Sequence, residues 1–300
     1  MTHWKWQPLI WIGAYILLLL SLMTPFNAIT VCFLMIPIVF LFVTLTVTQF
    51  VIGYLAAVAV LFLLAGTYAF PLALISVLFL GPAVVMGVMY KRKMPALTVV
   101  VAGTGSLIAV MLAGLLVSYL GGINLIDFSA QYIRESFATL PENMRQGLPE
   151  NFIENAIDMT SRMIPFYMIT FSLVYSAVTH AVSRRVLKLA GIEVPAMKPI
   201  KEWMLPKSLV WYYLLALILE LIVPPESDSV LVTFLWNLIP LLMLVFSLQA
   251  ISFLSFIADA KKWNKTLPIL GIVAFPLVPS LVSLLGVFDV AFNIRKMIKP

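Results

Sequence analysis

Between Trp6 and Tyr90 the chain contains no Asp, Glu, Lys, Arg or His. Soluble domains carry charged residues at about a quarter of their positions, so a run of 85 uncharged residues excludes a water-exposed surface here. A helix that crosses the hydrocarbon core of a bilayer needs about 20 mostly apolar residues. The run therefore predicts about four membrane-spanning helices, which short uncharged turns connect.

The composition of the whole chain is that of a multi-pass membrane protein. Of its 300 residues, 62% are apolar and 11% are charged, and the mean hydropathy is +1.07. The net charge of +6 would suggest nucleic-acid binding in a soluble protein. Here the basic residues lie in short loops between apolar segments, where they set topology and meet anionic lipid headgroups. We expect the lipid bilayer as a partner and no nucleic acid.

Few side chains are available for metal or cofactor chemistry. Cys32 is the only cysteine, which excludes an internal disulfide and a cysteine-rich metal site. The two histidines, His3 and His180, cannot supply the H-E-x-x-H motif of a metalloprotease, and no glycine-rich run ends in Gly-Lys-Ser/Thr as a P-loop does. We predict no metal, no cofactor and no enzymatic activity, so ATP hydrolysis would have to come from a partner.

Apolar runs and the breaks between them define the fold class. The prediction is all-α: a polytopic transmembrane helical bundle of about eight spans, plus a C-terminal short hairpin or ninth span, with one outer amphipathic helix. The predicted segments are 8–24, 28–45, 48–66, 69–90, 95–120, 163–187, 207–224, 229–258 and 267–290.

The last segment, 267–290, has two interpretations. As a single span it would carry the basic residues of 295–299 to the outside, against the positive-inside rule. A break between Pro276 and Pro279 would instead make a re-entrant hairpin, because each arm is too short to cross the bilayer. We favour the hairpin, with the C-terminus inside.

Basic residues predict the orientation of the other spans. A cytoplasmic N-terminus places 13 of the 19 Lys and Arg residues on the cytoplasmic side of the membrane. They are Lys5, Lys91, Arg92, Lys93, Arg184, Arg185, Lys188, Lys198, Lys201, Lys207, Lys261, Lys262 and Lys265. The outer side complements this, since 122–162 holds six acidic residues against three arginines and the 224–228 turn adds Glu226 and Asp228.

The outer loop contains an amphipathic pattern. Pro149 is well placed as a first helical residue, and apolar residues then recur at helical spacing, with acidic residues on another face. The apolar positions are Phe152, Ala156, Met159 and Met163. Two roles remain open: a lid over an external cavity, or a solvated helix that packs on the bundle.

We predict one integral membrane domain, 1–300, with three parts. Residues 6–120 form a five-span part with uncharged spans, 121–162 form the outer acidic loop, and 163–300 form spans that contain polar residues. Every ionisable candidate at membrane depth lies at His180 or later. We therefore expect residues 6–90 to be an inert four-pass wall and the second half to supply the polar groups.

Glu220 and Asn237 are the first candidates for ligand binding, because polar groups at membrane depth are costly and tend to be functional. Both are expected in the outer leaflet, where they could meet across the hairpin of two spans. The pair could line a polar pocket that is open to the outside. Alternatively it is structural, with Asn237 bound to Glu220 or to a carbonyl freed by Pro240.

His180 and Gln249 are further candidates. Gln249 lies beside serines of the same segment, and interhelical hydrogen bonds explain such residues without a ligand. The string Gly103-Thr104-Gly105-Ser106 could hold a serine nucleophile with His180 as its base, although no oxyanion donor can be named. Small residues recur at every fourth position from Ala102 to Gly114, which also suits close helix packing.

Asp289 is the only acidic residue among the last 40, so it should have a partner if it is buried. Gly286, Asp289, Asn293 and Lys296 share one helix face, and Arg295 lies alongside. A structural ion pair and a ligand contact are the two interpretations.

At these residues the chain resembles a known family. Gly286, Asp289 and Arg295 have the spacing of the closing G-x-x-D-x-x-x-x-x-R signature of the YybS family of uncharacterised bacterial membrane proteins. Gln249 and Ser252 match its Q-G-x-S segment, except that Ala250 replaces the glycine. The layout of spans agrees over essentially the full length. The resemblance implies a domain of unknown function, distantly similar to the substrate-binding S components of energy-coupling-factor transporters and to the rod-shape protein MreD.

From these observations we expect an S-component-like protein of the bacterial inner (cytoplasmic) membrane that takes its ligand from the outer side. It would bind a small, uncharged or amphipathic ligand and would rely on a separate ATPase or transmembrane coupling subunit for transport. The alternative is a structural or scaffolding protein of the cell envelope that docks envelope proteins. An intramembrane hydrolase is a distant third.

Overall fold

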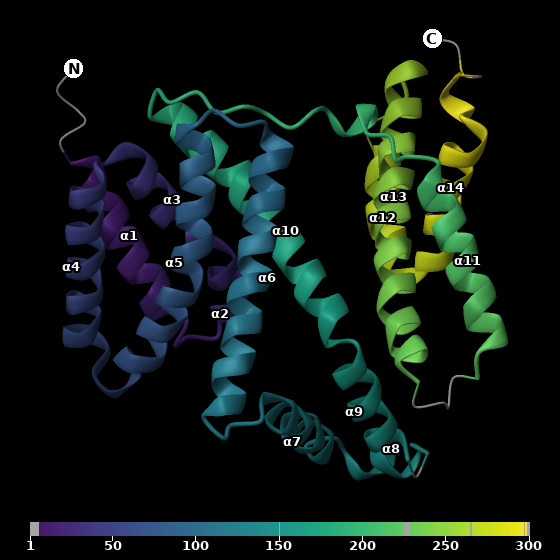
Figure 1. The fold of residues 1–300 in the computed structure, drawn as a ribbon, viewed down its shortest axis with the longest axis horizontal. Coiled ribbons are helices and arrows are strands. Elements are labelled where there is room, and N and C mark those ends of the chain that lie inside the picture. Colours follow the sequence, from purple (N-terminus) through teal and green to yellow (C-terminus); the bar gives the residue numbers. More distant parts are fainter. Residues whose placement is uncertain (1–5, 150, 225–228, 265, 297, 299–300) are drawn as a thin grey trace. The chain divides into compact units, whose positions relative to one another are not determined.

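The computed structural model describes a chain of helices, and no strand occurs in its described part. The described residues are 6–149, 151–224, 229–264, 266–296 and 298. The chain divides into two compact units, of which the first comprises Met1–Asp127 and Met168–Met197 and the second comprises Phe128–Tyr167 and Lys198–Pro300. The predicted all-α polytopic bundle is confirmed (Figure 1).

The first unit contains the charge-free half of the chain and most of α10. Its helices are α1 (Gln7–Ser21), α2 (Asn27–Thr30), η1 (Val31–Phe33), α3 (Met35–Thr44), α4 (Val47–Ala65), η2 (Gly66–Tyr68), α5 (Ala69–Lys91), α6 (Ala96–Leu120) and α10 (Ile164–Leu189) from Met168 onward. The turns have local causes: Thr46 and Gln49 form a capping box that starts α4, and Gly66 ends it with a φ of 56°, which glycine adopts without steric cost.

Helix α3 lies at the centre of the first unit. Every residue from Met35 to Phe42 is buried, although a surface helix would bury only one face. Its side chains pack in a core with α1, α4 and α5, which includes the stacked rings of Trp11 and Phe40. An uncharged sequence permits this arrangement because no face of α3 has to meet water.

Basic residues of the first unit gather at one side. The Lys91 ammonium donates a hydrogen bond to the Leu45 carbonyl, 3.2 Å away, so α5 ends beside the end of α3. His180 contacts Tyr90, and α10 continues past that level to Lys188. The 91–93 cluster and the basic end of α10 therefore share a side, as the positive-inside pattern predicts.

The second unit contains most of the predicted outer loop and the last four α-helices, α11 to α14. Its elements are α7 (Leu125–Ala138) from Phe128 onward, α8 (Glu142–Gln146), α9 (Phe152–Arg162), the first residues of α10, η3 (Ile200–Glu202), α11 (Ser208–Ile222), α12 (Val230–Ala260), α13 (Thr266–Leu277), α14 (Pro279–Phe292) and η4 (Ile294–Lys296). The predicted outer amphipathic helix is α9.

Two outer helices, α7 and α8, escaped the sequence analysis. Helix α7 joins α9 through an ion pair between Arg134 and Glu154 and an edge-on contact between Phe137 and Phe152. In each contact the two residues lie far apart in the sequence, so no local pattern indicates that they meet. Glu150, Glu226 and Asp228 of the predicted outer acidic groups lie outside the described residues.

The lengths of the helices agree with the predicted number of spans. In the described part of the chain, five helical stretches are long and apolar enough to cross a membrane, by length and composition. One of them, Val47–Lys91, contains the turn at Gly66 and so comprises α4 and α5. The shorter apolar helices include α1 and α11, which correspond to the predicted segments 8–24 and 207–224.

The last segment is a hairpin of two short helices. Helix α13 ends at Leu277 and α14 begins at Pro279, with the break at Val278 between the two prolines that predicted it. With 12 and 14 residues, the arms reach roughly 18–21 Å at about 1.5 Å per residue. A hydrocarbon core of about 30 Å is too thick for either arm to cross.

Candidate functional site

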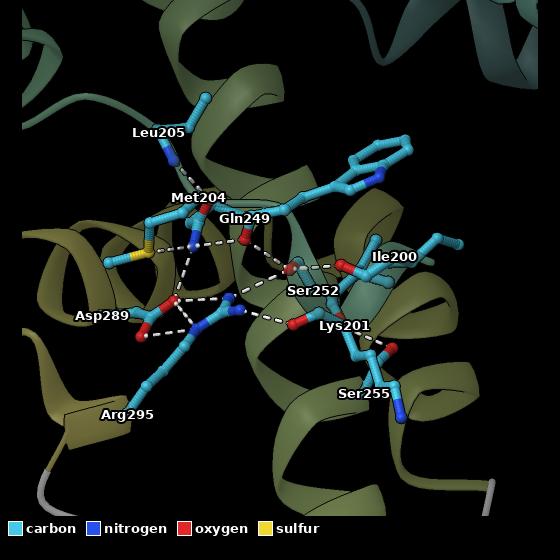
Figure 2. Close-up of polar contacts among 11 residues, drawn as sticks. Ile200, Lys201, Met204, Leu205, Gln249, Ser252, Ser255, Asp289 and Arg295 are labelled. Carbon is cyan, nitrogen blue, oxygen red and sulfur yellow. Dashed lines mark hydrogen bonds and ion pairs between the residues drawn. The ribbon is translucent and has the colours of Figure 1, made fainter. Parts of the chain in front are cut away.

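A buried ion pair occupies the end of α14 in the second unit (Figure 2). Asp289 is fully buried, and its carboxylate lies 2.8 Å from the Arg295 guanidinium, whose side chain is 12% exposed. Helix α14 ends before Arg295 because Asn293 adopts a left-handed conformation with a φ of 47°, a conformation that commonly ends helices. This turn folds the arginine back toward the aspartate six residues before it.

The guanidinium of Arg295 also binds the loop before α11. It donates to the Lys201 carbonyl at 2.6 Å and to the Ser252 hydroxyl of α12 at 2.9 Å. The Ser252 hydroxyl lies in turn within hydrogen-bond distance of the Ile200 and Trp203 carbonyls. A single cation thereby connects α12, α14 and residues 200–203.

Gln249 completes the network. Its amide nitrogen donates to the Asp289 carboxylate at 2.6 Å, and its amide oxygen accepts from the Leu205 backbone N–H at 3.1 Å. Ser247 and Ser255, which flank Gln249 on α12, bond only to carbonyls of their own helix. Gln249, Ser252, Asp289 and Arg295 form a group that we call the α12–α14 network.

Gly286 lets α14 approach α12 closely enough for this network. A Cβ atom at this position would collide with the Phe246 carbonyl of α12, so only glycine fits against that backbone. The two helices bury Phe246, Val287 and Val290 in one hydrophobic core. The glycine of the G-x-x-D pattern and the α12–α14 network therefore both support the close packing of α14 on α12.

The network also places Arg295 relative to the basic loops of the second unit. Lys201 forms an ion pair with Asp259 near the end of α12, and Arg295 binds the Lys201 carbonyl. The end of the α13–α14 hairpin therefore lies on the same side as the basic loop before α11 and the Lys261–Lys262 turn. This agrees with the hairpin interpretation, in which the C-terminus returns to the side it came from.

The other polar pair of the second unit is arranged differently from the expectation. The Asn237 amide accepts from the Phe166 N–H at 2.8 Å and donates to the carbonyls of Arg162 and Thr233. Glu220 on α11 has an exposed side chain. Among the described residues Asn237 thus ties the junction of α9 and α10 to α12, and its hydrogen bonds do not go to Glu220.

His180 lies in the first unit, where it meets the charge-free half of the chain. It is 2% exposed, and its Nδ1 atom lies 2.8 Å from the Tyr90 hydroxyl of α5, with the two rings stacked. Its Nε2 atom is buried without a hydrogen-bond partner. The Ser106 hydroxyl donates to the Gly103 carbonyl of its own helix, so the described contacts do not pair this serine with His180.

A column of buried polar side chains extends along α10 beside His180. Successive members lie one, three or four residues apart and so share one side of the helix. They are Ser172, Ser176, Thr179, His180 and Ser183, none of which is more than 2% exposed. We call this column the α10 seam.

The α10 seam faces α5 and α6. The Ser172 hydroxyl lies 3.7 Å from the Met111 sulfur, and a Cβ added to Gly103 would lie 3.0 Å from the Ser176 hydroxyl oxygen. The hydroxyls of Ser176, Thr179 and Ser183 have no hydrogen-bond partner in the described chain. Buried polar groups in folded proteins are nearly always paired, so this column is unusual in having several exceptions on one face.

The sequence analysis identified some of these residues and missed others. It selected Gln249 and Asp289 as separate candidates, and the structure brings them together. It missed the hydroxyls of the seam and Tyr90, because a serine or tyrosine in an apolar helix gives no local signal of a long-range partner. The seam could have been found from the spacing of its five polar residues alone.

No metal site of clustered side chains is evident in the described part of the chain. Among those residues, no three His, Cys, Asp or Glu side chains gather in a group that could hold a metal ion. The candidate chemistry therefore consists of hydrogen bonding by hydroxyls, the imidazole and amides.

Comparisons with known proteins support the resemblance to the YybS family. Residues 13–290 match the family described as "Predicted membrane protein (DUF2232)". The chain is 22% identical over 226 residues to the "Uncharacterized protein YybS" of Bacillus subtilis (strain 168), a match that covers 72% of this chain and 73% of the relative. No solved structure matches. The chain therefore belongs to the DUF2232 family of membrane proteins, which includes this YybS relative.

Proposed function

We propose that this chain is an integral membrane subunit that binds a small polar solute and, like an S component, depends on a separate ATPase for transport. The observation that carries the proposal is the α10 seam, in which the His180 Nε2 atom and three hydroxyls are buried without partners. A buried polar group without a partner costs roughly 1–3 kcal/mol, and lipid offers no replacement for water. Several such groups on one face favour a ligand that hydrogen-bonds to them.

The chemistry of the seam favours an uncharged or amphipathic solute. Hydroxyls both donate and accept hydrogen bonds, and an imidazole offers one donor or acceptor at each nitrogen. The seam itself contains no carboxylate, lysine or arginine that would neutralise a charged ligand. We propose a binding function without enzymatic activity, because among the described residues neither Ser106 nor any serine of the seam hydrogen-bonds to His180.

Mass spectrometry of the purified protein tests this function. We expect a small molecule to co-purify with the wild-type protein and to be lost in His180→Phe and in a variant that combines Ser176→Ala with Thr179→Val. The matched control is Ser247→Ala in the second unit, because that hydroxyl bonds only to its own helix. If the wild-type protein carries no small molecule, or if the control loses it equally, solute binding at the seam is excluded.

The second candidate is a scaffolding protein of the cell envelope. The observation that favours it is that the α12–α14 network satisfies its polar groups internally, as a rigid docking platform requires. Charge reversal within the basic residues of 184–207 separates the two functions. It should abolish a scaffold's activity and leave solute binding at the seam intact.

A further inference from the structure

A small pocket lies at the basic end of α10 in the first unit. Its volume is about 190 Å³, and it is lined by Arg184, Lys188, Glu193 and Val194. Pockets that enclose a drug-sized ligand measure about 300–1,000 Å³. This pocket therefore suits a single small polar group.

The walls of the pocket have a defined structure. Gly191, with a φ of 78°, ends α10, and the N–H groups of Gly191 and Ile192 bond back to the carbonyls of Lys188 and Leu187. This pattern of helix termination turns the chain back, which places Val194 beside Arg184. Leu187 and Val194 are buried in the core of the first unit, so packing fixes both walls.

Arg184 leaves most of its donors free. Its Nε atom donates to the Val194 carbonyl at 3.4 Å. Among the described residues, this is the one hydrogen bond of the Arg184 guanidinium. A guanidinium carries five N–H donors in a planar fork. A partly buried arginine with one long hydrogen bond is well suited to bind an anion through two parallel bonds.

The charges of the lining predict the charge of the ligand. Arg184 and Lys188 contribute two positive charges and Glu193 one negative charge, so the pocket matches a group with a single negative charge. A phosphodiester carries that charge. The carboxylate of Glu193 can accept hydrogen bonds from hydroxyls attached to the same headgroup.

The position of the pocket favours a lipid over a soluble phosphate. Leu189, next to Lys188, is 88% exposed at the end of a helix long and apolar enough to cross the bilayer. Basic pockets at the membrane surface bind phospholipid headgroups. We propose that this pocket binds the phosphodiester headgroup of an anionic glycerophospholipid, independently of solute binding at the seam.

The test measures lipid retention. The protein is reconstituted in nanodiscs of phosphatidylcholine with a minority of phosphatidylglycerol, extracted with detergent, and analysed for bound lipid by mass spectrometry. We expect phosphatidylglycerol to be enriched on the wild-type protein and reduced on the order of tenfold in Arg184→Gln, because hydrogen bonds to charged groups are among the stronger ones. Arg185→Gln is the matched control, since Arg185 is exposed and does not line the pocket.

Three outcomes would overturn the proposal. An equal loss in Arg185→Gln would mean that the lipid responds to surface charge in general. Displacement of the lipid by inorganic phosphate would assign the pocket to a soluble ligand. If Arg184→Gln does not fold, Lys188→Gln replaces it, because the Lys188 side chain is exposed, and unchanged retention in that variant would also overturn the proposal.

Discussion

Replacing Arg295 with methionine should destabilise the second unit far more than breaking an exposed ion pair does. The substitution removes the hydrogen bonds of Arg295 to Asp289, Ser252 and the Lys201 carbonyl. It leaves a fully buried carboxylate whose remaining partner among the described residues is the Gln249 amide. Removal of one partner from a buried pair costs roughly 3–5 kcal/mol, chiefly because the other charge is left uncompensated.

A double substitution separates the cost of the unpaired charge from the cost of lost packing. Adding Asp289→Asn to Arg295→Met removes the buried charge and keeps the shape of the side chain. The double variant should therefore be more stable than Arg295→Met by at least about 1 kcal/mol, since groups in one network are not additive. The control is Lys201→Met, which breaks an ion pair with side chains that are 38% and 60% exposed and should cost no more than about 1 kcal/mol.

The free energy of unfolding is measured by titration with sodium dodecyl sulfate in mixed micelles, with loss of helical circular dichroism as the signal. Two results would refute the reasoning. Arg295→Met could cost no more than Lys201→Met, which would mean that the pair is solvated in the membrane-bound protein. The double variant could also be as unstable as Arg295→Met, which would assign the loss to packing rather than to charge.

Two further predictions follow from the same helices. Gly286→Ala should lower the free energy of unfolding by about 1–3 kcal/mol or more in the same titration, because overpacking strains a close contact and the added Cβ would collide with a backbone carbonyl. The control is Gly114→Ala, which should be neutral because nothing lies within 4 Å of its added Cβ. In a Cys32→Ser background, single cysteines in place of the exposed Lys262 and Lys296 should react with an impermeant maleimide from the same side of the membrane. Labelling from opposite sides would exclude the hairpin.

Hydrophobic pattern and breakers were sufficient to predict the helices. The predicted segment 48–66 differs from α4 (Val47–Ala65) by one residue at each end, and 95–120 differs from α6 (Ala96–Leu120) by one residue at its start. Such boundaries are set locally, by the Gly66 turn and by the proline before α6. The side of the C-terminal hairpin was also predictable, because charge distribution and proline position both favour it.

The faces of the helices were harder to predict. The small residues from Ala102 to Gly114 were expected to form the close contact of α6, but Gly114 is exposed, and the buried positions include Gly103 and Leu107. A helix with apolar residues on all sides gives no amphipathic signal. Which side packs then depends on the partner helix, and the sequence of α6 alone does not contain that information.

The candidate site could be predicted only in pieces for the same reason. Asp289 required a partner once it was placed in an apolar helix, and Arg295 was the nearest cation along the chain. The contact of Gln249 with Asp289 spans 40 residues, and that of Tyr90 with His180 spans 90. Contacts of this kind follow from the packing of whole helices and have no local pattern.

The division of the chain into a polar half and an inert wall does not describe where polar groups gather. Helix α10 is encoded in the second half, yet from Met168 onward it packs with the charge-free helices, and Tyr90 of that half binds His180. The second unit pairs its buried ions and amides with one another, which stabilises a fixed structure. The first unit leaves the Nε2 atom of His180 and the hydroxyls beside it without partners. Because an unpaired buried group is costly unless something binds it, the first unit is the better place to search for the solute that we propose.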